Sequence, residues 1–194
     1  MKYIASIVEG HGEVECLPAL LHRIAVNESY EGTLIVNPPI RIKSGSFFSD
    51  PSYREKQLTL ATAKVGERDG LVLVLLDCED GCPAQIGPQL LNDAIRIRAN
   101  ANVMIALAYR EYETWFLYAI ESLRGLRGIS MGTTPPPQPE SIRGAKEWLG
   151  ARMDGSYDPI THQIEFTRCI SLDSARASRS FDRLYLRILA FLLS

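Results

Sequence analysis

A chain of 194 residues is long enough to bury one sizeable hydrophobic core but short for two full domains, so we expect a single domain over residues 1–194. Hydrophobic residues make up 46% of the sequence and charged residues 23%, which excludes a wholly disordered or fibrous chain. The formal net charge of −2 excludes an overall basic field that would attract nucleic acid at long range. Contact with nucleic acid would therefore need a local basic patch or bound cations.

The sequence shows no sign of a membrane segment or a secretion signal. No window approaches the roughly 20 uninterrupted apolar residues of a membrane span. The first residues, MKYIASIVEGHGE, reach acidic side chains before the apolar region of a signal peptide could form. The four cysteines lack the paired spacing of a zinc site, so we expect reduced thiols. These features predict a cytoplasmic protein without membrane contact.

Predicted strands and helices alternate through about residue 123. Short apolar runs predict strands at 3–8, 33–36, 71–76 and 102–108, and the run LVLVLL at 71–76 suits the centre of a parallel sheet. Helical spacing predicts a helix that begins near Val14 and further helices at 51–68, 88–98 and 111–123. This order favours an α/β fold, a three-layer sandwich around a mostly parallel central sheet.

The remaining third of the chain predicts a helical extension. Residues from about 124 to 140 contain the triplet PPP and predict an exposed loop after a core at about 1–123. We expect a C-terminal extension at about 141–194, with a short helix at 142–149 and a final helix at 180–193. The apolar run FDRLYLRILAFLL should pack onto the sheet as a covering helix.

Acidic residues follow two of the predicted strands. Glu9 leaves the first strand and Glu13 follows where the helix opens, while Asp77, Glu79 and Asp80 follow the run LVLVLL. Because ligands of open parallel sheets bind at the carboxyl ends of the strands, we expect these five carboxylates at one edge. Like charges at that density repel one another, and a divalent metal relieves the repulsion. Oxygen ligands without a Cys/His set favour Mg²⁺ or Mn²⁺.

Each acidic segment also has a purely structural explanation. Gly10 and Gly12 permit a tight turn, and the positive end of a helix dipole favours Glu9 and Glu13. The segment DCEDG can likewise form a solvated turn with an Asp at a helix cap. Because both segments follow buried strands in sheet order, the functional explanation is favoured.

The spacing of these acids resembles that of the Toprim domain, which topoisomerases, bacterial primases and OLD-family nucleases share. The resemblance rests on E-G-x-x-E at a strand–helix junction and on a D-x-[DE] pair after a later apolar strand. The segments VEGHGEVECLP, LLDCEDGCPAQIGPQL, EYETWFL, IRGAKEWL and SRSFDRL are similar to a Toprim-like family of small bacterial proteins, the domain of unknown function DUF4276. This resemblance implies a Rossmann-like fold and a separate ATPase as partner, in a mobile-element or phage-defence system.

The resemblance implies roles for the acids. Glu9 matches an acid that serves in metal binding or general acid/base chemistry, and Glu13 matches the second glutamate of the nuclease-type E-G-x-x-E. Asp77 and Glu79 match the D-x-D pair. Because Glu79 stands where the family pattern has Asp, Asp80 is an alternative second ligand.

Two later residues complete the candidate site. Glu113 matches the later acid of OLD-type nucleases as a further metal ligand, and Lys146 is a candidate catalytic contact to phosphate. Both also have structural explanations, because a helix dipole favours an acid such as Glu113 early in a helix and Lys146 is typical of a surface residue.

Together these features predict a Toprim nuclease that cleaves the phosphodiester bonds of nucleic acid, foremost DNA, with Mg²⁺ or Mn²⁺. With a net charge of −2, the chain alone should bind DNA weakly. The main alternative is a non-catalytic regulatory subunit that binds metal or nucleotide within an ATPase complex. The chain has no room for the extra domains of a topoisomerase or primase. A phospho-acceptor receiver domain fits poorly, because the first strand ends in a single Glu followed by Gly.

Basic residues gather in two segments. One holds Arg41, Lys43, Arg54 and Lys56, and the other holds Arg168, Arg176, Arg179, Arg183 and Arg187. Either group could follow a phosphate backbone. Because acids such as Asp173 and Asp182 are interspersed, the charge pattern favours solvated faces with ordinary ion pairs.

Overall fold

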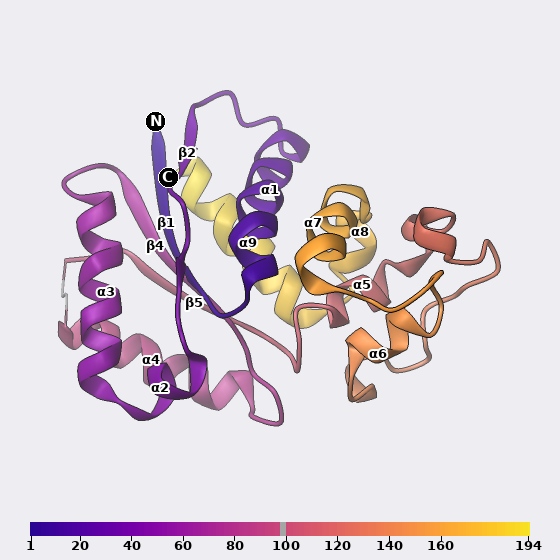
Figure 1. Ribbon diagram of the computed structural model, residues 1–194. Coiled ribbons are helices and arrows are strands. Elements are labelled where there is room, and N and C mark those ends of the chain that lie inside the picture. The colour runs from indigo at the N-terminus through magenta and orange to yellow at the C-terminus, as the bar shows by residue number, and fades with distance from the viewer. Residues whose placement is uncertain (98–99) are drawn as a thin grey trace.

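The centre of the protein is a parallel β-sheet. The computed structural model describes residues 1–97 and 100–194. Its strands are β1 (Lys2–Val8), β2 (Leu34–Val36), β3 (Ile40–Arg41), β4 (Gly70–Asp77) and β5 (Val103–Ala108). Within these ranges the order is β2-β1-β4-β5, with β3 pairing farther along β1, and all the pairings are parallel. Figure 1 shows the strands running between α3 on one side and α1 and α9 on the other.

The register of the strands brings three carboxyl ends to one edge of the sheet. Ile7 pairs with Val74, and Asp77 pairs with Ala108, so the chain leaves β1, β4 and β5 at neighbouring positions. A proline pair at 38–39 separates β2 from β3, because proline has no N–H to donate to a strand ladder.

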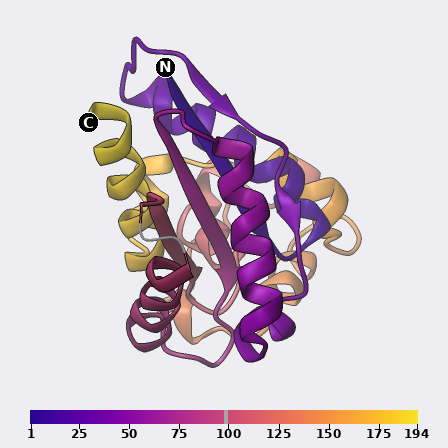
Figure 2. The same ribbon diagram turned by 90° about the vertical axis from the view of Figure 1, so that its left-hand side faces the viewer.

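Helices cover both faces of the sheet, which confirms the predicted three-layer α/β sandwich. Alternate side chains of β4 enter two separate cores, with Leu71, Leu73 and Leu75 in one and Val72, Val74 and Leu76 in the other. The first core lies beneath α1 (His11–Asn27) and α9 (Arg179–Leu193). The second lies beneath α2 (Ser44–Ser49), α3 (Pro51–Val65) and α4 (Pro83–Ile97). Figure 2, viewed from the second face, shows α3 crossing in front of the sheet.

The chain after β5 adds short helices to the first core. These are α5 (Thr114–Tyr118), η1 (Ile120–Leu123), η2 (Leu126–Gly128), η3 (Pro139–Ser141), α6 (Ala145–Gly150), α7 (Pro159–Cys169) and α8 (Leu172–Ala175). Helix α7 packs against α1, and α9 packs against α1 and β5 as the sequence predicted for the final helix. In the described ranges no helix combines the length and apolarity that crossing a membrane requires.

The predicted strands lie within one residue of their observed bounds, whereas several predicted helix bounds were wrong. The helix predicted at 51–68 ends at Val65, and the one predicted at 142–149 is α6, which begins at Ala145. Helix α1 begins at His11 rather than near Val14, so Pro18 lies inside it. Helix α4 begins at Pro83 rather than at residue 88, because a proline in the first turn needs no N–H partner. Arg98, the predicted end of that helix, lies outside the described residues.

The C-terminal third differs most from the sequence prediction. The predicted helix at 111–123 is divided into α5 and η1, and its side chains at 114–117 are all buried rather than arranged on one face. The elements η2, η3, α7 and α8 of this part were not predicted, and neither were β3 and α2 nearer the N-terminus. The sequence does contain a start signal for α7, because Asp158 caps the N–H groups of Ile160 and Thr161 and Pro159 follows it.

The close packing of α1 on α7 can be tested by substituting the glycine at their contact. A Cβ added at Gly12 would lie 1.9 Å from Gln163 Oε1 and 2.7 Å from the carbonyl oxygen of Pro159. We expect Gly12→Ala to lower the free energy of unfolding by about 1–3 kcal/mol through overpacking. Gly87→Ala, where nothing lies within 4 Å, should raise it by about 0.5–1 kcal/mol because alanine favours a helix interior. Urea denaturation measures both free energies of unfolding. A Gly12→Ala variant as stable as the wild type would contradict this packing.

Candidate active site

Three carboxylates from separate parts of the chain meet at the carboxyl edge of the sheet. Glu13 stands in the first turn of α1, Asp77 ends β4, and Glu113 immediately precedes α5. Burial raises the pKa of Asp77 well above its usual range, and the charges of Glu113 and Glu13 raise it further. We call these three residues the acid cluster.

Backbone hydrogen bonds hold the acid cluster together from the β4–β5 side. The bonds between these strands continue past their ends, because the N–H of Cys78 donates to Ala108 and that of Glu79 donates to Arg110. The chain then turns so that the N–H of Tyr112 donates to Asp77 Oδ1 at 2.8 Å. This turn places Glu113 beside Asp77.

Helix α7 and the turn before it supply two hydrogen-bond donors to the acid cluster. The side-chain amide of Gln163 donates to Glu13 Oε1 at 3.2 Å and to Glu113 Oε1 at 3.3 Å. The hydroxyl of Tyr157 donates to Glu113 Oε1 at 3.1 Å. Burial and the neighbouring charge of Glu113 raise the pKa of Tyr157, so its phenol keeps the proton that it donates. Sequence reasoning missed both residues, since only the start signal of α7 is visible in the sequence.

Lys146 is the cation of the site. Its Nζ lies 3.6 Å from Glu113 Oε2 and 3.5 Å from Glu111 Oε2. Burial by itself would lower the pKa of Lys146, but the carboxylates of Glu113, Asp77 and Glu111 outweigh burial and raise the pKa above its ordinary value. The ammonium group therefore stays charged, and the sequence-predicted phosphate contact lies against the acid cluster.

Burial sets the protonation of Glu113. Its side chain is fully buried, and that burial raises its pKa to about 7 against the opposing effect of Lys146. A carboxyl group with this pKa can hold or release a proton near neutral pH.

The other predicted acids have different surroundings. Glu9 accepts a hydrogen bond from the hydroxyl of Ser44 at 2.5 Å. Asp80 is exposed and paired with Arg110 at 2.7 Å and Arg143 at 2.9 Å, and hydrogen bonds from these two arginines lower its pKa. Glu79 is exposed, with a left-handed backbone at φ 48°.

The donor chemistry of the acid cluster suits a hard divalent cation. Its ligands would be carboxylate oxygens, and Glu113 Oε2 is buried with no hydrogen bond, its partner being the Lys146 ammonium at 3.6 Å. Gly10 leaves room for the Glu13 carboxylate, because a Cβ there would lie 2.1 Å from Glu13 Oε2. As the side chains lie, no group of three or more His, Cys, Asp or Glu in the described ranges is placed to hold a metal ion. Mg²⁺ or Mn²⁺ would therefore require these side chains to reorient.

The fold and the site together define a class: an α/β sandwich with a buried acid cluster at the carboxyl edge of a parallel sheet. The chain belongs to the family described as Domain of unknown function (DUF4276), whose model matches residues 8–189. The matched segment includes the whole acid cluster, Lys146 and the helix α7. Neither a search of curated proteins nor a search of solved structures found a match.

The raised pKa of Glu113 predicts how stability depends on pH. The folded protein binds this proton up to about pH 7, whereas the unfolded chain releases it near the ordinary value of 4.5. The folded state therefore loses stability as the pH rises through this window, by at most about 3 kcal/mol. We expect Glu113→Gln to flatten the decline between pH 5 and 8 and to exceed the wild type in stability at pH 8.

Chemical denaturation in EDTA at a series of pH values measures this dependence. The matched control is Glu55→Gln, which makes the same change at an exposed site on α3 and should leave the slope unchanged. Equal slopes for wild type and Glu113→Gln would show that Glu113 does not titrate in this window.

Proposed function

We propose that this protein is a metal-dependent nuclease that cleaves phosphodiester bonds with Mg²⁺ or Mn²⁺, related to the Toprim domain of OLD-family nucleases. The observation that carries the proposal is the gathering of the buried Glu13 and Glu113 with the half-buried Asp77 at the carboxyl edge of the sheet, where Lys146 pairs with Glu113. Like charges in such a site raise one another's pKa, and a divalent cation is the partner that best relieves them.

In this proposal the residues of the site have different roles. Glu13, Asp77 and Glu113 would hold the metal, which when bound polarises a phosphate and stabilises the leaving oxygen. Lys146 keeps its charge and can offset the negative charge that develops on a phosphate. Without the metal the pKa of Glu113 is about 7, so metal binding would displace the proton of this carboxyl group. Glu9 follows β1 at the same edge of the sheet and accepts a hydrogen bond from the hydroxyl of Ser44.

Burial of the acid cluster favours action with a partner. Glu113 has no exposed surface and Glu13 is only 8% exposed. Tyr157 and Gln163 also hold these two carboxylates by hydrogen bonds, so a nucleic acid would reach Glu13 and Glu113 only after these side chains move, although Lys146 is partly exposed. We propose that a separate ATPase drives this opening. The same burial favours a second candidate function, a regulatory subunit whose acid cluster binds metal without catalysing a reaction.

Metal binding should stabilise the fold, because an ion that binds only the folded state shifts the folding equilibrium. At an Mn²⁺ concentration of 100 times its Kd, the gain is about 2.7 kcal/mol. We expect the melting temperature of the wild type to rise with Mn²⁺ and that of Asp77→Asn/Glu113→Gln to stay constant. Glu55→Gln should respond like the wild type. An equal rise in the double variant would exclude the acid cluster as the metal site.

Cleavage should depend on the same acids. The wild type with Mn²⁺ should cut supercoiled plasmid, linear duplex, single-stranded DNA or RNA slowly alone and faster with a co-purified ATPase partner. We expect Asp77→Ala to reduce cleavage by about 100-fold or more, since it removes a ligand of the metal that stabilises the transition state. Glu55→Ala is the control and should retain full activity. Metal binding without cleavage of any substrate, with or without the ATPase, would favour the regulatory function.

A further inference from the structure

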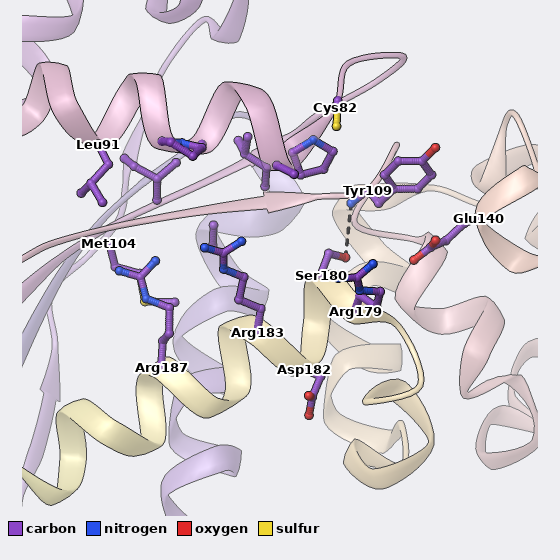
Figure 3. A pocket seen from close by; sticks show the side chains of 17 residues that line it. Cys82, Leu91, Met104, Tyr109, Glu140, Arg179, Ser180, Asp182, Arg183 and Arg187 are labelled. Atoms are coloured by element: carbon purple, nitrogen blue, oxygen red, sulfur yellow. Dashed lines mark hydrogen bonds between the residues drawn. The ribbon is translucent and has the colours of Figure 1, made fainter.

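A groove of about 560 Å³ runs along β5, away from the acid cluster. Helix α4 forms one wall, α9 forms the other, and residues 104–107 of β5 form the floor. Figure 3 shows β5 between the two helices, with Tyr109 and Glu140 at one end of the groove and Arg187 toward the other. Nothing in the proposed nuclease chemistry uses this groove.

The floor of the groove is an unpaired strand edge. β5 is the last strand of the sheet in the described ranges. Because Val72 N–H donates to Asn102 and Cys78 N–H donates to Ala108, the even-numbered residues of β5 face β4. The N–H and C=O groups of Ile105 and Leu107 then point to the open side. The next outward N–H, that of Tyr109, donates to Ser180 Oγ at 3.3 Å.

One wall of the groove carries a row of arginines. Arg179, Arg183 and Arg187 are four residues apart on α9, so they share one face of the helix. None of the three has an ion-pair partner among the described residues. Figure 3 shows Arg183 and Arg187 pointing towards β5 and Asp182 pointing away; Asp182 is paired with Arg176 at 2.7 Å.

The opposite wall carries no charge. The α4 residues that line the groove are Pro83, Ala84, Gly87, Pro88 and Leu91. A strand lying on the edge of β5 would therefore have a basic wall on one face and an apolar wall on the other.

The spacing of the arginines matches that of an extended polypeptide. Four residues of helix rise about 6 Å, and two residues of a strand rise about 6.6 Å. Side chains at alternate positions of an added strand would therefore meet successive arginines, and the intervening side chains would face α4. Acidic residues fit the first set of positions and aliphatic residues fit the second.

We propose that this groove binds an extended segment of a partner protein in which acidic and aliphatic residues alternate. The segment adds a strand to β5 through the backbone groups of Ile105 and Leu107. Its acids pair with Arg183 and Arg187, and its aliphatic side chains pack on the α4 wall. A nucleic acid strand would satisfy the arginines but would leave the apolar wall and the strand edge without matching groups.

A synthetic peptide tests the proposal directly. The probe is a fluorescein-labelled nine-residue peptide of alternating Glu and Val, and its affinity for the full chain is measured by fluorescence anisotropy. We expect saturable binding, slower amide hydrogen exchange at Ile105 and Leu107, and at least a tenfold loss of affinity for Arg183→Glu/Arg187→Glu. The control Lys56→Glu/Arg168→Glu makes the same change in net charge at exposed positions outside the groove and should bind as the wild type does.

Two further probes separate strand addition from simple charge attraction. A peptide N-methylated at alternate residues on its β5-facing side should lose binding, because it lacks the main-chain donors. A 12-nucleotide single-stranded DNA should bind more weakly than the peptide. The proposal is overturned if the peptide does not bind, if Arg183→Glu/Arg187→Glu or N-methylation leaves its affinity unchanged, or if the oligonucleotide occupies the groove more tightly. Melting curves show separately that the variant is folded.

Discussion

The crowding of two buried carboxylates and the half-buried Asp77 at one edge of the sheet is the constraint on which the arrangement of the chain depends. Glu13, Asp77 and Glu113 lie where water is largely excluded, so their charges interact strongly and each ionised group needs a partner. The partners, Lys146 and Gln163, both belong to the chain after β5. The C-terminal third therefore supplies part of the site at the carboxyl edge of the sheet.

The topology of the sheet explains why the acids gather at this point. After β1 the chain crosses to the face covered by α1, and after β4 it crosses to the face covered by α4. Neighbouring strands whose helices lie on opposite faces leave a crevice between their carboxyl ends. Glu13 and Asp77 stand on the two sides of this crevice, and the turn after β5 brings Glu113 into it. The fold thus defines the location of a site, while the side chains define its chemistry.

The sequence carries the strand framework but not the surroundings of the acids. Buried strands are short apolar runs bounded by turn residues, so the fold class could be predicted together with the acids that follow the strands. The contacts of Gln163 depend instead on how α7 packs on α1, which no local pattern encodes. No local pattern shows the surroundings of Asp80 either. It follows Asp77 by three residues in the sequence but pairs with Arg110 and Arg143 in the structure.

A continuous set of contacts joins the edge groove to the acid cluster. Ser180 Oγ accepts hydrogen bonds from the N–H of Tyr109 and from the indole N–H of Trp115, the latter at 2.8 Å. The Trp115 ring lies 4.6 Å from that of Tyr112, whose N–H holds Asp77. A strand added along β5 that reached Tyr109 would compete with Ser180 for its N–H. These contacts transmit a change to Asp77 only if Ser180 has two discrete arrangements, because a packed contact with a single arrangement carries no coupling free energy.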